Sequence, residues 1–130
     1  MAINERQYQQ TTWNQLEKAL RWALNHLNLR DWQIDFMSDT LPEEDDEPVY
    51  AKFSSKNPLV KKGGIIIDLK AHKRNNVNLF CTIFHETLHI FLSDCKIENE
   101  DAEEAIICLL EQDLYTIFCL ETKRKLVAYK

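Results

Sequence analysis

Residues 79–92 read LFCTIFHETLHIFL, and apolar side chains recur in them at positions 79, 80, 83, 84, 88, 91 and 92. This spacing follows the 3.6-residue period of an α-helix and gives that helix a wide apolar face. The segment therefore predicts a helix that is buried on most sides. We expect it to begin near Asn76 and to end near Ser93-Asp94.

The same helix contains His85-Glu86-Thr87-Leu88-His89, which has the pattern H-E-x-x-H. Histidines four residues apart lie one turn apart on the same helix face, so both imidazoles can reach one tetrahedral zinc ion. Glu86 lies about a third of a turn from His85, where its carboxylate can face the open coordination position. The pattern predicts His85 and His89 as zinc ligands and Glu86 as the general base.

The flanks of the motif carry no charge. Charged side chains in such surroundings cost stability unless they are paired or bound to a metal. The alternative is that both histidines are structural or surface residues and that Glu86 is a solvated helix acid. The combination of all three on one apolar helix favours the metal site.

The rest of the chain predicts two more helices and three strands. Apolar residues at helical spacing behind Thr12 predict a helix over residues 12–28, and another helix is expected from the N-cap Asn99 to about residue 120. Alternating or β-branched runs predict strands at 32–36, 49–53 and 65–69. The order α-β-β-β-α-α predicts an α+β fold.

Composition narrows the class of protein. With 130 residues, 45% hydrophobic and 28% charged, we expect residues 1–130 to form a single globular domain and a monomer. No apolar run is long enough to cross a bilayer, and the polar N-terminus lacks a secretory signal, which predicts a cytoplasmic protein with reduced cysteines. The net charge of -5 argues against general nucleic-acid binding. The acidic, proline-containing segment 38–48 is expected to be an exposed loop.

This element order and motif resemble the minimal zincins, in which a helix and a short sheet precede the active-site helix and a further helix brings the third metal ligand. The run 81–92, a short turn and then 100–118 look like small metallopeptidase-like proteins of phages and mobile elements. More distantly, they resemble repressor-cleaving peptidases of the ImmA/IrrE type. That type usually has glycine where this chain has Leu88. The resemblance implies a zinc-dependent peptidase acting on a protein or peptide substrate.

The resemblance also implies that the third zinc ligand is a glutamate of the last helix. Glu103 is the first choice, because it continues the inward stripe expected for Ile106 or Ile107, Leu110 and Leu114. Glu100 is the alternative. In that arrangement Glu104 would hold a ligand imidazole through its other nitrogen. Two cysteines are further candidate ligands: Cys81, which shares a face with His85, and Cys95.

Other residues are candidates for binding substrate. His72 or one of the tyrosines Tyr50, Tyr115 and Tyr129 could stabilise an oxyanion, as such residues do in related enzymes. The strand at 65–69 could pair with an extended peptide if it lies at a sheet edge before the active helix.

Three functions follow from these observations. The first is a zinc metallopeptidase, a hydrolase that cleaves peptide bonds through a metal-activated water. The alternative is a noncatalytic zincin-like module that binds zinc and acts through protein-protein interaction. A third is a nucleic-acid-associated protease of the SprT type. Glu86 favours catalysis, because a structural zinc site has no need of an acid at that position.

Overall fold

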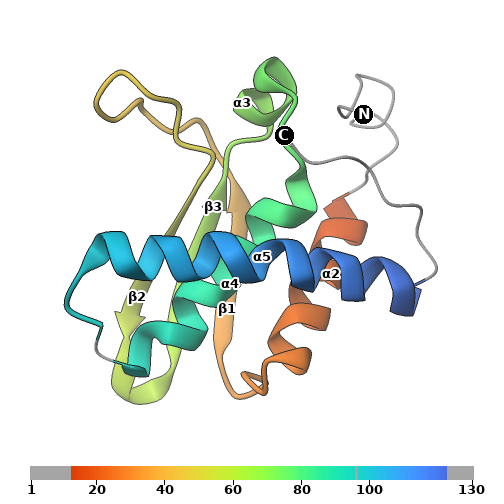
Figure 1. Cartoon of the computed structure of the whole chain (residues 1–130), viewed down its shortest axis with the longest axis vertical. Helices are drawn as coiled ribbons and strands as arrows, with labels where there is room; N and C mark the ends of the chain where they lie inside the picture. The colour runs from red at the N-terminus through yellow and green to blue at the C-terminus, as the bar shows by residue number, and fades with distance from the viewer. Residues whose placement is uncertain (1–12, 96, 123–130) are drawn as a thin grey trace.

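The computed structural model describes residues 13–95 and 97–122 (Figure 1). These ranges contain four α-helices and one small mixed sheet, so the predicted α+β class is confirmed. The helices are α2 (Trp13–His26), α3 (Leu69–Asn75), α4 (Leu79–Leu92) and α5 (Glu100–Thr122), and the strands are β1 (Gln33–Ser38), β2 (Ala51–Asn57) and β3 (Lys62–Ile67). The predicted cap Thr12 and the candidate Tyr129 lie outside the described residues.

The three strands have the order β1-β3-β2. β3 runs parallel to β1 and antiparallel to β2, with Ile65 opposite Phe36 on one side and Phe53 on the other. The expectation that the strand of Ile65 lies at a sheet edge is therefore wrong. Its β-branched run is typical of a central strand buried on both faces, and the outer strands are β1 and β2.

A helix that the sequence analysis did not predict follows β3. The strand ends at Ile67, because Asp68 becomes the N-cap of α3 and its side chain accepts a hydrogen bond from the Ala71 amide at 3.0 Å. Asn76 adopts the left-handed conformation (φ 55°) and ends the helix. With only seven residues, α3 has no apolar period long enough to detect.

α4 is the helix on which the rest of the structure packs. It contacts α2, α5 and β2, and ten of its fourteen residues are buried, as its sequence predicted. Phe84 meets Trp22 of α2 and Phe118 of α5, with ring centroids 5.6 and 5.3 Å apart. These aromatic contacts set how α5 lies along α4.

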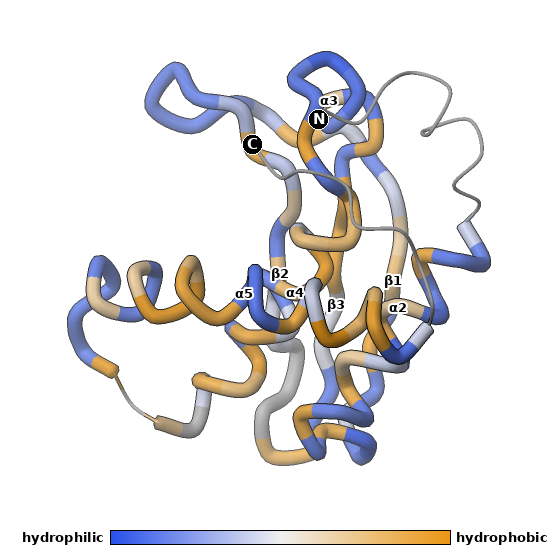
Figure 2. Tube along the Cα trace, turned by 45° about the vertical axis from the view of Figure 1, so that its right-hand side comes forward, coloured by the Kyte–Doolittle hydropathy of each residue, from blue (hydrophilic) through white to orange (hydrophobic). Residues whose placement is uncertain are grey.

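The acidic segment predicted to be an exposed loop lies on the surface. Residues 42–48 are all exposed, as predicted, and the loop that contains them projects from the molecule as a hydrophilic segment (Figure 2). Across residues 13–95 and 97–122, no helix has the length and apolar character needed to span a bilayer.

Candidate metal centre

The register of α4 is set at its first turn. The Asn78 side chain accepts hydrogen bonds from the amides of Phe80 and Cys81, at 2.9 and 3.2 Å, so the helix begins at a defined residue. From that start, His85 and His89 fall one turn apart on the same face, with ring centroids 5.0 Å apart. The predicted placement of the two histidines on one helix face is therefore present in the structure.

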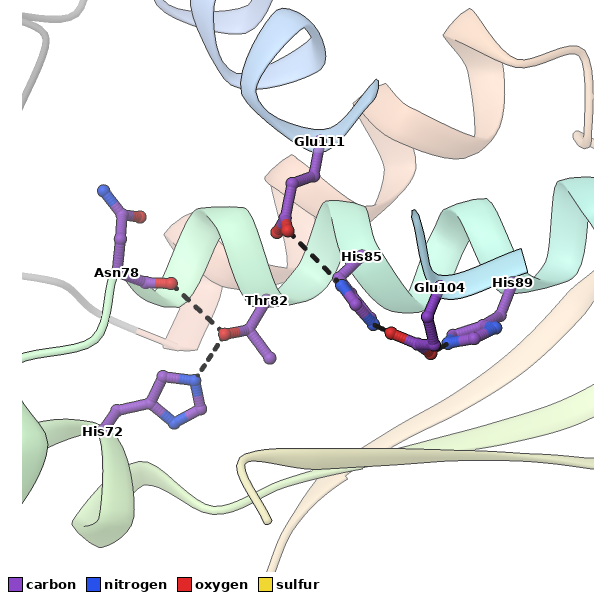
Figure 3. Close-up of polar contacts among 7 residues, drawn as sticks. All are labelled: His72, Asn78, Thr82, His85, His89, Glu104 and Glu111. Atoms are coloured by element: carbon purple, nitrogen blue, oxygen red, sulfur yellow. Dashed lines mark hydrogen bonds and ion pairs between the residues drawn. The ribbon is translucent and has the colours of Figure 1, made fainter. Parts of the chain in front are cut away.

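A buried network joins α3 to α4 beside the motif (Figure 3). His72 donates from Nδ1 to the carbonyl oxygen of Asp68 at 2.6 Å, which leaves Nε2 to accept from the Thr82 hydroxyl at 2.7 Å. His72 is fully buried, and this burial lowers its pKa to about 4. Both ring nitrogens are thus engaged in holding α3 against α4, which gives His72 a structural position.

Glu104, in the second turn of α5, lies between the two histidines (Figure 3). One of its oxygens is 2.9 Å from Nε2 of His89, and the other is 3.2 Å from Nε2 of His85. The candidate ligand atoms of these three residues all lie within 4.8 Å of one another, so the group could hold a metal ion. Two imidazoles and one carboxylate form the ligand set of many catalytic zinc sites.

A second carboxylate contacts the other nitrogen of each ring. Glu103 lies 3.4 Å from Nδ1 of His89, and Glu111 lies 3.5 Å from Nδ1 of His85. A carboxylate that accepts from Nδ1-H fixes the tautomer in which the Nε2 lone pair is free to bind a metal. Burial acts to lower the pKa of His85, but Glu111 and the other nearby carboxylates outweigh it, and the pKa is raised.

The two neighbouring glutamates Glu103 and Glu104 contact different nitrogens of the histidines. Glu104, expected outside the ligand set, lies at both Nε2 atoms, whereas Glu103, the first choice as ligand, lies at Nδ1 of His89. Glu100 is exposed and belongs to neither potential metal group of the described residues. The cause is the rotation of α5: Leu110, expected to be buried, is 37% exposed, whereas Glu111 is 4% exposed.

Glu86 lies beside this group and is itself buried, with 7% of its surface exposed. Burial raises the pKa of its carboxyl group, and the neighbouring His85 and His89 oppose that rise only in part. The side chain lines the same hollow as both histidines, Glu103 and Glu104. Its carboxyl group therefore shares one hollow with the imidazoles of His85 and His89.

Two adjoining hollows flank His85 and Glu86 and together form a groove between β2 and the helices α4 and α5. The first, about 480 Å³, is lined by Ala51, Lys52 and Phe53 of β2 together with the histidines and Glu104. The second, about 370 Å³, adds Tyr50, Val77, Thr82, Cys108 and Glu111.

The two described candidate tyrosines differ in their position relative to the groove. Tyr50 lines it, whereas Tyr115 is buried and stacks on Phe80 with centroids 6.5 Å apart. Of the cysteines that the sequence suggested as ligands, Cys81 is fully buried, which raises the pKa of its thiol, and Cys95 is exposed. Neither belongs to a potential metal group within the described ranges.

Sequence reasoning missed Glu111 and Cys108. Together with His85 they form a second group whose candidate ligand atoms lie within 4.8 Å of one another. The signal was present in the spacing, since Glu104, Cys108 and Glu111 stand at i, i+4 and i+7 on one face of α5.

Comparison with known proteins finds no matching family model, no matching curated protein and no matching solved structure.

Proposed function

We propose that this protein is a zinc-dependent peptidase of the minimal zincin type, in which His85, His89 and Glu104 hold the ion and Glu86 is the general base. The observation that carries the proposal is the convergence of two Nε2 atoms on the oxygens of Glu104, at 2.9 and 3.2 Å, beside a buried Glu86. Three protein ligands of this kind leave a fourth position open, as catalytic rather than structural zinc sites do.

The charge of the site fits a dication. Four carboxylates surround two imidazoles, and two of these acids, Glu86 and Glu111, are almost completely buried. Buried carboxylates that crowd together repel one another and lose solvation, so a bound cation stabilises their ionised forms. Glu103 and Glu111 are placed to orient the ligand imidazoles, because each carboxylate can accept a hydrogen bond from an Nδ1–H group.

Zinc held by His85, His89 and Glu104 would supply a Lewis acid for a peptide carbonyl and for a water molecule. Glu86 would accept a proton from the attacking water and return it to the leaving amine. Its position suits this exchange, because the buried carboxyl group shares one hollow with both histidines. Tyr50, which lines the same groove, is the candidate to donate a hydrogen bond to the developing oxyanion.

The groove also favours an extended peptide as substrate. Among residues 13–95 and 97–122, β2 pairs with β3 along one side only and lies at the edge of the sheet. Its residues Ala51, Lys52 and Phe53 line the groove. The free backbone groups of an edge strand can pair with an added strand. We therefore assign to β2 the peptide-pairing role that the sequence analysis assigned to residues 65–69.

Metal content tests the ligand set. Protein purified without added metal or a histidine tag should contain close to one zinc per chain. In a Cys108→Ser background, where the second candidate group lacks its thiolate, His89→Ala and Glu104→Ala should lose it, whereas Glu103→Ala should keep it with an affinity lower by about 10–100-fold. Loss of zinc in Glu103→Ala together with retention in Glu104→Ala would return Glu103 to the ligand position.

Cleavage of an unstructured peptide library tests the chemistry. Glu86→Gln should keep its zinc and lose activity by about 10²–10⁴-fold, because a carboxamide cannot accept the proton. Equal cleavage by zinc-loaded wild type and Glu86→Gln would contradict the assigned base. Zinc binding without cleavage of any library member would favour the noncatalytic zinc-binding module.

A further inference from the structure

We propose that Nδ1 of His85, the thiolate of Cys108 and the carboxylate of Glu111 form a second metal position, which takes a thiophilic divalent cation. This position lies on the side of the His85 ring opposite to Glu104 (Figure 3). It needs neither His89 nor Glu104, so it stands whether or not the proposed peptidase function holds.

The geometry of the three side chains carries the inference. Glu111 reaches from α5 to within 3.5 Å of Nδ1 of His85, and all three candidate ligand atoms lie within 4.8 Å of one another. Cys108 and Glu111 are three residues apart on α5 and therefore share a helix face. The carboxylate is held in place, because only 5% of the Glu111 side chain is exposed.

The surroundings give a cation both access and room. Cys108 is exposed, and the second hollow of the groove, about 370 Å³, is lined by all three side chains as well as by Tyr50 and Thr82. Water from this hollow can complete a tetrahedral set. A nitrogen, a sulfur and an oxygen ligand select zinc, cobalt or cadmium over magnesium and calcium, which prefer oxygen ligands alone.

The two metal positions share His85 and therefore compete. A neutral imidazole has one lone pair, so a cation bound at Nδ1 leaves the proton on Nε2. Nε2 then cannot bind a cation beside His89 and Glu104. Occupation of the Cys108 position consequently withdraws one ligand from the proposed catalytic position, and an excess of a thiophilic metal should inhibit the enzyme.

Cobalt is the probe, because a cobalt thiolate has a sulfur-to-metal charge-transfer absorption that nitrogen and oxygen ligands do not produce. The titration is made on the full chain with His89→Ala and Glu104→Ala, in which the first position is disabled. We expect this absorption to saturate near one cobalt per chain. Adding Cys108→Ser should abolish it, and adding Glu111→Gln should weaken cobalt affinity about tenfold or more.

Cys95→Ser is the matched control, since Cys95 is the other exposed cysteine and lies outside the group. It should leave the absorption unchanged. Absence of the thiolate absorption before Cys108 is changed, or its persistence in Cys108→Ser, would overturn the second position. If the doubly substituted chain does not fold, the Cys108→Ser and Cys95→Ser comparison is made in the otherwise wild-type chain with excess cobalt. Failure of the peptidase proposal would appear separately, as equal peptide cleavage by zinc-loaded wild type and Glu86→Gln, because Glu86 belongs to neither group of candidate ligands.

Discussion

His72 should make this protein sensitive to mild acid. The ring is fully buried, donates from Nδ1 to the Asp68 carbonyl at 2.6 Å and accepts at Nε2 from the Thr82 hydroxyl at 2.7 Å. A proton added to Nε2 would place a charge in the interior and remove the acceptor of the Thr82 hydrogen bond. The contact between α3 and α4, one turn before His85 and Glu86, would be weakened.

The size of the effect follows from the pKa of His72, which burial lowers from 6.5 to about 4. Between these two values the unfolded chain binds a proton that the folded chain does not, so the free energy of unfolding falls as the pH falls. The stabilisation is present in full above pH 6.5 and is lost progressively toward pH 4. At 1.36 kcal/mol per pH unit, the loss from this one residue is about 3 kcal/mol.

The assay is denaturant unfolding at several pH values across this window, with a chelator present so that metal binding does not contribute. His72→Gln should be less stable than wild type at neutral pH but should lose about 3 kcal/mol less between pH 6.5 and pH 4. His26→Gln, which changes an exposed histidine of α2, is the control and should follow the wild-type curve. Parallel curves for wild type and His72→Gln would refute the reasoning.

Three further predictions concern the packing that positions the site. Leu114→Ala should lower the free energy of unfolding by about 2–5 kcal/mol and Leu110→Ala by less than about 1 kcal/mol, because the first side chain is 6% exposed and the second 37%. Equal losses measured by denaturant unfolding would contradict the observed rotation of α5. Gly63→Ala should lower the free energy of unfolding by about 1–3 kcal/mol in the same assay. The added Cβ would lie 2.7 Å from Phe53 Cε1 and 3.0 Å from the Ser54 carbonyl oxygen of β2. An unchanged unfolding midpoint would show that β2 can move away. Asn78→Ala should cost about 1 kcal/mol through loss of the α4 N-cap, whereas Asn78→Ser should recover most of it, and equal losses in both variants would show that the cap bond is not the cause.

The sequence by itself determined the features that depend on local pattern. The apolar period of residues 79–92 predicted a buried helix, and that helix carries His85, Glu86 and His89 on the face turned toward the groove. The α+β class followed from the order of the periodic segments. Each of these depends on residues a few positions apart, whose relation the helix or strand geometry dictates.

Strand order depended on distant parts of the chain. The pairing of β3 with both β1 and β2 joins segments separated by loops, and the local pattern of Ile65–Ile67 is compatible with either an edge or a centre. The short helix α3 escaped detection because its caps, Asp68 and Asn76, are clear only once the chain direction after β3 is known. The strand with an open edge beside the motif could be identified only from the sheet.

The choice between Glu103 and Glu104 was likewise decided by tertiary structure. Neighbouring residues on a helix point about 100° apart, so either could face the histidines until the rotation of α5 about its axis is known. That rotation is set by the packing of Phe118 on Phe84 and by the burial of Ile107 and Leu114. Burying Glu111 rather than Leu110 runs against hydrophobicity, and it occurs where His85 of the facing helix offers the buried carboxylate a partner.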